Sequence, residues 1–81
     1  MTKPPPRELD TEKIDEAVLA LLYLTLHDGW RAWKGHDWAA LNRLHEKGLI
    51  DDPRSKRKSV VFSEEGLAEA GRLFESMFTK P

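Results

Sequence analysis

The stretch Asp37-Trp-Ala-Ala-Leu-Asn-Arg-Leu-His-Glu-Lys-Gly-Leu-Ile50 decides the fold, because it predicts a helix with a defined start and end that runs directly into a strand. Asp37 is placed to cap the helix, since its carboxylate can accept a hydrogen bond from a first-turn N–H. Gly48 is placed to take the left-handed conformation after the helix, with Leu49 against Leu44. One face of this helix comprises Trp38, Leu41, Leu44 and His45.

Length and composition limit the chain to one small domain without disulfides or thiolate metal sites. The 81 residues contain no cysteine, carry a net charge of −1, and can bury only a small core, which favours dimerisation. The sequence has neither an apolar run long enough for a membrane span nor the hydrophobic segment of a signal peptide. We therefore expect a cytoplasmic protein with a disordered tail over residues 1–9 and a single domain over residues 10–81.

The small net charge hides a separation of charge along the sequence. Residues 29–62 contain eight Lys or Arg and four Asp or Glu, whereas the remaining residues contain five basic and ten acidic side chains. A basic segment of this kind suits a polyanionic partner such as DNA. The alternative is that these charges only solvate exposed faces, and the sequence leaves both interpretations open.

Two further helices are predicted on either side of the basic segment. The first is capped by Asp10 or Thr11, is dense in apolar residues from Ile14 to Leu26, and ends at Gly29. Because apolar residues surround it almost completely, we expect burial on several sides, within the core or against a second subunit. The last helix follows the cap residue Ser63. Its apolar stripe comprises Leu67, Ala70, Gly71, Phe74, Met77 and Phe78.

Aromatic and basic residues alternate between the first two predicted helices. Trp30 and Trp33 are spaced to share one face of a short helical turn, with Arg31 and Lys34 beside them. Such side chains can stack on nucleic-acid bases and pair with phosphate groups. They can also anchor a loop onto the core, with the cationic stems lying over the rings.

A β-hairpin is predicted after the central helix. Turn-forming residues follow Ile50, and a strand over residues 57–62 is expected to pair with residues 49–51. The tip of this hairpin can contact phosphate groups, or it can protect an exposed sheet edge from pairing with other strands. The cations of the tip are Arg54, Lys56, Arg57 and Lys58.

No set of residues specifies a chemical reaction. His27, His36 and His45 lie on different predicted elements, so they lack the short spacing of a zinc-binding pair. The five glycines are scattered rather than grouped in a phosphate-binding loop, and no serine has the context of a nucleophile elbow. We therefore expect no enzymatic activity, metal, cofactor or small-molecule ligand.

Two resemblances to known families follow from these motifs. The run Leu41-x-x-Leu44-x-x-x-Gly48-Leu-Ile50, the basic residues after it and Val60-Val-Phe-Ser-Glu-Glu-Gly66 resemble the recognition helix, wing and closing helix of winged helix-turn-helix regulators. This resemblance implies an α+β, mostly α fold with a long N-terminal helix, a short turn, a central helix, a two-stranded β-hairpin wing and a C-terminal amphipathic helix. The chain from Ile14 onward also resembles a family of short bacterial proteins of unknown function.

The winged-helix resemblance implies that the helix over residues 38–47 enters the major groove of duplex DNA, with the basic tip on the phosphates. The chain departs from the family pattern in two ways. The helix before the recognition helix is reduced to residues 30–34, and Asp37 puts negative charge near the bases. The predicted DNA-binding residues are Arg31, Lys34, Asn42, Arg43, Arg54, Lys56, Arg57 and Lys58.

Two functions are consistent with these features. The first is a DNA-binding transcriptional regulator, supported by the basic segment on a winged-helix order of elements. The second is a protein-interaction or homodimerisation module on the same scaffold without DNA binding, supported by the excess apolar surface of the first and last helices. The predicted dimer interface comprises Leu22, Leu26, Phe74, Met77 and Phe78.

Overall fold

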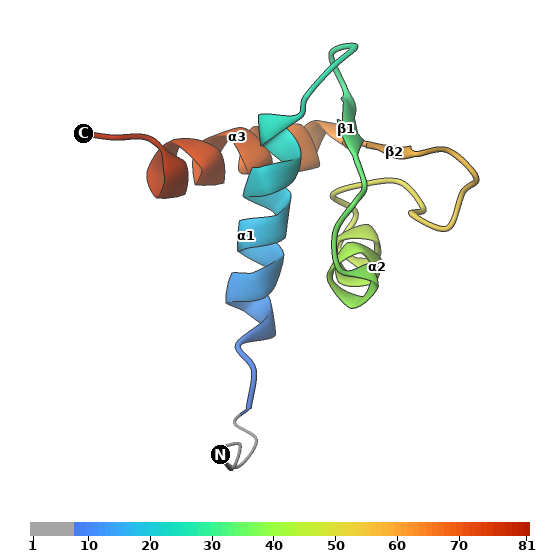
Figure 1. Ribbon diagram of the computed structural model, residues 1–81, viewed down its shortest axis with the longest axis horizontal. Coiled ribbons are helices and arrows are strands. Elements are labelled where there is room, and N and C mark those ends of the chain that lie inside the picture. The colour runs from blue at the N-terminus through green and yellow to red at the C-terminus, as the bar shows by residue number, and fades with distance from the viewer. Residues whose placement is uncertain (1–7) are drawn as a thin grey trace, which may run out of the picture.

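The computed structural model describes residues 8–81, which form three helices and a two-stranded antiparallel sheet (Figure 1). This arrangement confirms the predicted α+β, mostly helical architecture. The first seven residues of the predicted tail lie outside the described residues. In chain order the elements are α1 (Thr11–Leu24), β1 (Arg31–Trp33), α2 (Trp38–Glu46), β2 (Ser59–Val61) and α3 (Glu64–Phe78).

Each helix begins after a residue whose side chain caps its first turn, as the sequence predicts. The capping residues are Asp10 for α1, Asp37 for α2 and Ser63 for α3. Each side-chain oxygen accepts a hydrogen bond from the backbone N–H three residues later, at 3.1, 3.1 and 2.9 Å respectively. These bonds satisfy backbone donors that a helix leaves unpaired at its start, so all three start points are fixed locally.

The end of α2 also has the predicted geometry. Gly48 adopts a positive φ of 76°. Its N–H donates to the His45 carbonyl at 2.9 Å, and the Leu49 N–H donates to the Leu44 carbonyl at 3.0 Å. This pair of bonds closes the helix in the left-handed manner typical of a glycine just beyond a helix end. The chain therefore leaves α2 in a direction set by its own backbone.

The sheet differs from the predicted hairpin. β2 forms its ladder with β1, which precedes α2 in the chain, and its pairing with residues 49–51 is limited. The latter segment contributes a single bridge, between Ile50 and Phe62. The predicted pairing is thus confirmed only as this bridge and a backbone hydrogen bond from the Asp51 N–H to the Val61 carbonyl. The pairing with β1 was missed, because alternation of side chains indicates which face of a strand is buried but not which strand lies beside it. The paired residues of the sheet are Arg31 with Val61, Ala32 with Val60, and Trp33 with Ser59.

The segment after α1 is a strand and not the predicted helical turn. α1 ends at Leu24, and residues 28–30 form a turn in which Gly29 has a φ of 77°, a conformation that glycine adopts without strain. Two backbone hydrogen bonds of 2.8 and 2.9 Å between His27 and Arg31 close this turn. After this turn the chain reverses direction, and its backbone N–H and C=O groups form hydrogen bonds with β2. These bonds outweigh the helical spacing of the two tryptophans, which had predicted a helical turn.

The core lies where α1 packs against α2 and α3, and the inner face of the sheet closes one side of it. α3 lies across the C-terminal end of α1 (Figure 1). Leu19, Ala20 and Leu22 of α1 are fully buried, whereas Leu21 and Leu24 are exposed, so the expected burial of this helix is confirmed for only part of its surface. Leu22 thus belongs to the core, and its side chain is not available to the predicted dimer interface. Within residues 8–81, all three helices are too short or too polar to span a bilayer.

Candidate nucleic-acid interface

Residues 51–58, which precede β2, form a mostly exposed loop that is called the basic loop below. A pair of hydrogen bonds joins the first residue of this loop to the end of β2. The Asp51 N–H donates to the Val61 carbonyl at 2.9 Å, and the Val61 N–H donates to the Asp51 carboxylate at 2.8 Å. Pro53 is fully buried at the base of the loop. The loop therefore projects from one end of the molecule on a fixed base (Figure 1).

Lys34, one of the predicted DNA-binding residues, anchors the basic loop to the end of β1. Its ammonium group donates hydrogen bonds to the carbonyls of Pro53 and Ser55, at 2.8 and 2.6 Å. Its backbone N–H donates to the Lys58 carbonyl at 3.1 Å. The same ammonium group lies 5.9 Å from the centre of the Trp38 ring, within the range of a cation–π contact. Lys34 therefore shapes the loop, and its charge is directed toward the loop carbonyls.

Arg54 pairs with an acidic neighbour on the same loop. Its guanidinium donates to the two carboxylate oxygens of Asp52 at 3.0 and 3.2 Å, and its backbone N–H donates to Asp52 at 2.9 Å. The guanidinium first, and the backbone N–H second, hold the pKa of the Asp52 carboxyl below its usual range. Because Asp52 stays ionised, it balances the positive charge of Arg54.

Three consecutive cations of the basic loop remain available to a partner: Lys56, Arg57 and Lys58. Their side chains are exposed. Within residues 8–81, none of the ion pairs involves them. Exposed positive charge without acidic partners attracts phosphate groups and raises the rate at which polyanions are captured. These three side chains are the strongest electrostatic feature of the candidate interface.

The outer face of the sheet places an aromatic ring beside the basic loop. Side chains alternate along β1, so Arg31 and Trp33 point away from the core that buries Ala32. Trp33 is 53 % exposed. The Arg31 guanidinium donates to the Ser59 hydroxyl at 3.4 Å. Trp33 is paired in register with Ser59, the first residue of β2, so it lies where the basic loop joins the sheet.

The Trp33 ring is held in place by residues that follow α1. It stacks on the His27 imidazole, with ring centres 4.3 Å apart and ring planes 26° apart. The Thr25 carbonyl oxygen lies 2.8 Å from His27 Nδ1, and the Thr25 hydroxyl accepts a hydrogen bond from the Trp33 backbone N–H at 3.1 Å. The sequence contains no signal for this stack, because it arises only when the turn after α1 brings the two residues together.

The other two tryptophans, Trp30 and Trp38, are also about half-exposed. None of the three rings is therefore buried as a core anchor. The sequence suggested that the alternating aromatic and basic residues could anchor a loop to the core. In the structure the Lys34 ammonium group, rather than an aromatic ring, anchors the basic loop. The aromatic rings are left at the surface, which is the arrangement that base stacking requires.

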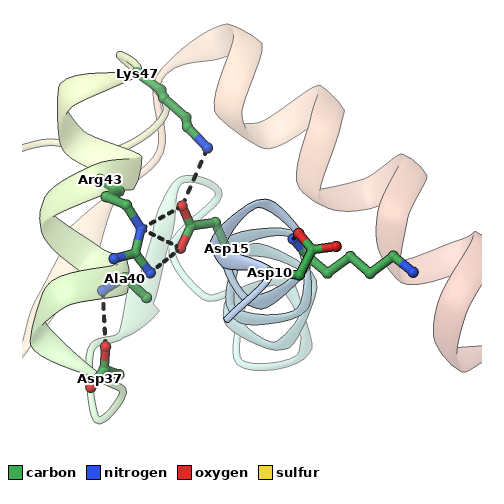
Figure 2. A network of polar contacts seen from close by, with 7 residues as sticks. Asp10, Asp15, Asp37, Ala40, Arg43 and Lys47 are labelled. Carbon is green, nitrogen blue, oxygen red and sulfur yellow. Dashed lines mark hydrogen bonds and ion pairs between the residues drawn. The ribbon is translucent and has the colours of Figure 1, made fainter. Parts of the chain in front are cut away.

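Arg43, a further predicted DNA-binding residue, instead joins α2 to α1. Figure 2 shows Arg43 and Lys47 converging on the Asp15 carboxylate. The guanidinium donates through Nε and Nη2, each at 2.8 Å, and the Lys47 ammonium group donates at 3.3 Å. The Asp15 side chain is only 2 % exposed. On α2, Asn42 remains exposed, so it is the member of the predicted groove-facing pair that can still reach a partner.

Asp15 is a structural residue that the sequence analysis missed. Burial alone would raise its pKa, but hydrogen bonds from Arg43 and Lys47 outweigh burial and hold the pKa of Asp15 below its ordinary value. The signal was present in α1, since Asp15 lies three and seven positions before the buried Val18 and Leu22. Helical spacing could therefore have identified a buried acid, although it could not have identified the cations that pair with it.

A groove of about 340 Å³ is lined by α1, α3 and the end of α2, beside the Asp15 ion pair. Its two cations, Lys47 and Arg72, already pair with acids. Glu12 and Glu16 line the same groove, and no ion pair within the described part of the chain involves them. The surplus charge of the groove is therefore acidic, which does not suit a nucleic acid. Its apolar residues are Leu19, Leu44, Leu49 and Leu73.

The remaining members of the predicted dimer interface fall into two groups. Leu26 and Phe74 are partly buried against the core, and the Phe74 ring centre lies 5.4 Å from that of Tyr23. Met77 and Phe78 are 43 % and 45 % exposed at the end of α3. The last turn of α3 is therefore the part of this set that a second chain could contact.

Comparison with known proteins identifies the family. Residues 10–80 match a family described as "Domain of unknown function (DUF6429)". The chain is 58 % identical over 73 residues to "Uncharacterized protein y4hR" of Sinorhizobium fredii (strain NBRC 101917 / NGR234), a match that covers 90 % of this chain and 99 % of the relative. No solved structure matches the chain. The predicted likeness to a family of short bacterial proteins of unknown function is confirmed, and the chain belongs to the DUF6429 family.

Proposed function

We propose that the protein is a DNA-binding regulator that catalyses no reaction, with the basic loop acting as the wing of a winged-helix-like domain. The observation that carries this proposal is the run of three exposed cations Lys56-Arg57-Lys58, for which the described residues supply no acidic partner. Lys34 and Arg54 support the proposal indirectly, because their hydrogen bonds hold the loop in one shape. A preformed loop loses little conformational entropy when it binds.

The proposed binding depends on phosphate groups more than on base edges. Asn42 is exposed on α2, but Arg43 is engaged with the buried Asp15. The helix thus offers one polar side chain where specific recognition of bases needs several donors and acceptors in the major groove. Binding is therefore expected to be weakly selective for sequence and strongly dependent on salt.

The test is a titration of fluorescently labelled duplex DNA with the protein, followed by anisotropy at several salt concentrations. If the three loop cations each neutralise one phosphate, log K falls with log[salt] with a slope of about −3. Alanine substitution of Lys56, Arg57 and Lys58 together is expected to bring this slope close to zero and to weaken binding at low salt at least about tenfold.

A matched control replaces two lysines outside the proposed interface, Lys13 of α1 and Lys80 after α3, both of which are exposed. This variant makes the net charge of the chain, which is −1, more negative but is expected to bind DNA with nearly the original slope. Equal effects of the loop and control variants would show that binding is nonspecific attraction, and an absence of binding by the wild-type protein at low salt would overturn the proposal.

A second candidate function is homodimerisation through the last turn of α3. It is favoured by the exposure of Met77 and Phe78, two large apolar side chains on one helical turn. The Phe78 ring continues an aromatic series, since its centre lies 6.2 Å from that of Phe74, which in turn contacts Tyr23. This surface is separate from the basic loop, so dimerisation and nucleic-acid binding can be tested independently.

A further inference from the structure

We infer that the outer face of the sheet binds single-stranded nucleic acid by stacking a base on Trp33. The inference rests on the proposed function for its phosphate contacts and adds the class of nucleic acid and the residue that receives a base. It begins from the stack of Trp33 on His27, which places an indole ring at the surface in a fixed orientation.

The Trp33 ring has the geometry of a stacking platform. One face lies against the His27 imidazole, with ring centres 4.3 Å apart, and 53 % of the residue is exposed to solvent. Hydrogen bonds through Thr25 hold both residues. A ring that is already oriented loses little freedom on binding, and every base has a flat face that can stack on it.

Cations that can contact the sugar–phosphate chain lie on both sides of this ring. Arg31 precedes Trp33 on the same face of β1. On the other side, the backbone hydrogen bond from Lys34 to Lys58 holds the end of the basic loop against the end of β1. A strand that places a base on Trp33 can therefore direct its backbone along Lys56, Arg57 and Lys58, the combination of ring and basic track found in single-strand binding sites.

Single-stranded nucleic acid fits this surface better than a duplex does. In a duplex, each base is already stacked between its neighbours, and its flat faces are not accessible to a protein ring. A single strand can turn a base outward at small cost. The exposed ring would contribute little to a duplex, whereas the loop cations would contact the phosphates of either form.

The experiment uses tryptophan fluorescence to observe the stacked ring directly. Replacing Trp30 and Trp38 with phenylalanine leaves Trp33 as the only tryptophan, and replacing Trp33 and Trp38 leaves Trp30 as a matched reference. Oligothymidylate and oligouridylate are added to each variant, which separates DNA from RNA as the source of the single strand, and a duplex is added as a third arm. Quenching of Trp33 by at least one of the two single strands, larger than its quenching by the duplex and larger than that of Trp30, is expected.

Affinity provides the second readout. Trp33→Ala is expected to weaken binding of the preferred single strand by about 5- to 100-fold and to leave duplex binding nearly unchanged. Trp33→Phe, which keeps an aromatic ring, is expected to recover most of that loss. Trp30→Ala, at an exposed ring in the turn between α1 and β1, is the control and is expected to have little effect. Circular dichroism spectra establish that each variant is folded.

The outcomes separate this inference from the proposed function. If binding depends on the three loop cations but Trp33→Ala leaves single-strand affinity unchanged and Trp33 is not quenched, the stacking inference is overturned and phosphate binding stands. If the loop substitutions also have no effect, both fail. Loss of single-strand affinity in Trp33→Ala with rescue by Trp33→Phe supports stacking, because a purely structural role would weaken duplex binding equally.

Discussion

At the scale of single residues, Asp15 shows how a buried charge joins two helices. Its carboxylate is almost inaccessible to solvent, yet it receives hydrogen bonds from Arg43 and Lys47 across 28 and 32 positions of the sequence. A buried ion is costly unless its hydrogen-bonding capacity is satisfied, and here both oxygens have partners. The Arg43 and Lys47 side chains are partly exposed to solvent, so the Asp15 carboxylate is the most deeply buried of the three charged groups.

We expect Asp15→Asn to lower the free energy of unfolding by about 1–3 kcal/mol, because it replaces charge-assisted hydrogen bonds with weaker ones and leaves two cations without their counter-ion. Urea unfolding followed by circular dichroism measures the change. Glu69→Gln is the control, since Glu69 forms an exposed pair with Arg72 whose contribution is small. Similar losses in the two variants would contradict the special role of the buried carboxylate.

The same residue predicts a dependence of stability on pH. The folded-state pKa of Asp15 is depressed, so its contribution is fully present above the pKa of an unfolded aspartate, about 3.9. That contribution is lost as the pH falls through the lower folded-state value. The difference in unfolding free energy between wild type and Asp15→Asn is therefore expected to shrink on going from neutral pH to strongly acidic pH. A difference that stays constant or grows with acidification would show that the ionised carboxylate is not its source.

At the scale of elements, the start of α3 is fixed against the segment that follows α2. The backbone N–H and the hydroxyl of Ser63 both donate to the Leu49 carbonyl, at 3.0 and 3.2 Å. A Cβ atom at Gly66 would lie 1.8 Å from that same oxygen. The close approach of α3 to Leu49 therefore requires a glycine at position 66, although glycine is unfavourable inside a helix.

Gly66→Ala tests this contact, because two effects of opposite sign compete. Alanine would gain about 1 kcal/mol of helix propensity, but the backbone clash must displace α3 or the end of α2. We expect the clash to dominate and to destabilise the protein by about 1–3 kcal/mol in thermal or urea unfolding. Gly35→Ala is the matched control, since a Cβ there meets no atom within 4 Å. A stabilised Gly66→Ala variant would mean that the segment after α2 adapts freely.

At the scale of the whole molecule, the two candidate interaction surfaces lie at opposite ends of the longest axis (Figure 1). The basic loop projects at one end, and the last turn of α3 lies at the other. Acidic residues predominate outside residues 29–62, so the charge of the chain is polarised although its net value is only −1. This separation would allow a dimer to form through α3 while both basic loops remain open to nucleic acid.

The dimer is testable by sedimentation velocity over a range of protein concentrations. We expect the wild-type chain to associate as concentration rises and Phe78→Asp to remain monomeric, because a charge would be buried in the apolar interface. Ser76→Asp, an exposed position on the same helix, serves as the control and is expected to associate normally. A wild-type protein that is monomeric at every concentration would remove this function and leave the basic loop unaffected.

The sequence by itself determined the features that depend on neighbouring residues. The caps at Asp10, Asp37 and Ser63 and the glycine-terminated end of α2 were predictable, because each rests on hydrogen bonds that span only a few positions. The apolar stripe of α3 and the exposed loop cations were likewise evident from the order of residues.

Only the tertiary structure decided which distant residues meet. It pairs β2 with β1, although α2 separates the two strands in the sequence. It also brings the Arg43 side chain to the Asp15 carboxylate and the Lys34 side chain to the carbonyls of the basic loop. These contacts join residues from 19 positions apart, for Lys34 and Pro53, to 30 positions apart (61 − 31), for Arg31 and Val61, so their formation depends on how the elements pack rather than on local conformational preference. A long cationic side chain can reach a carboxylate, a carbonyl or a phosphate equally well, and its surroundings in the folded chain determine which of these it binds.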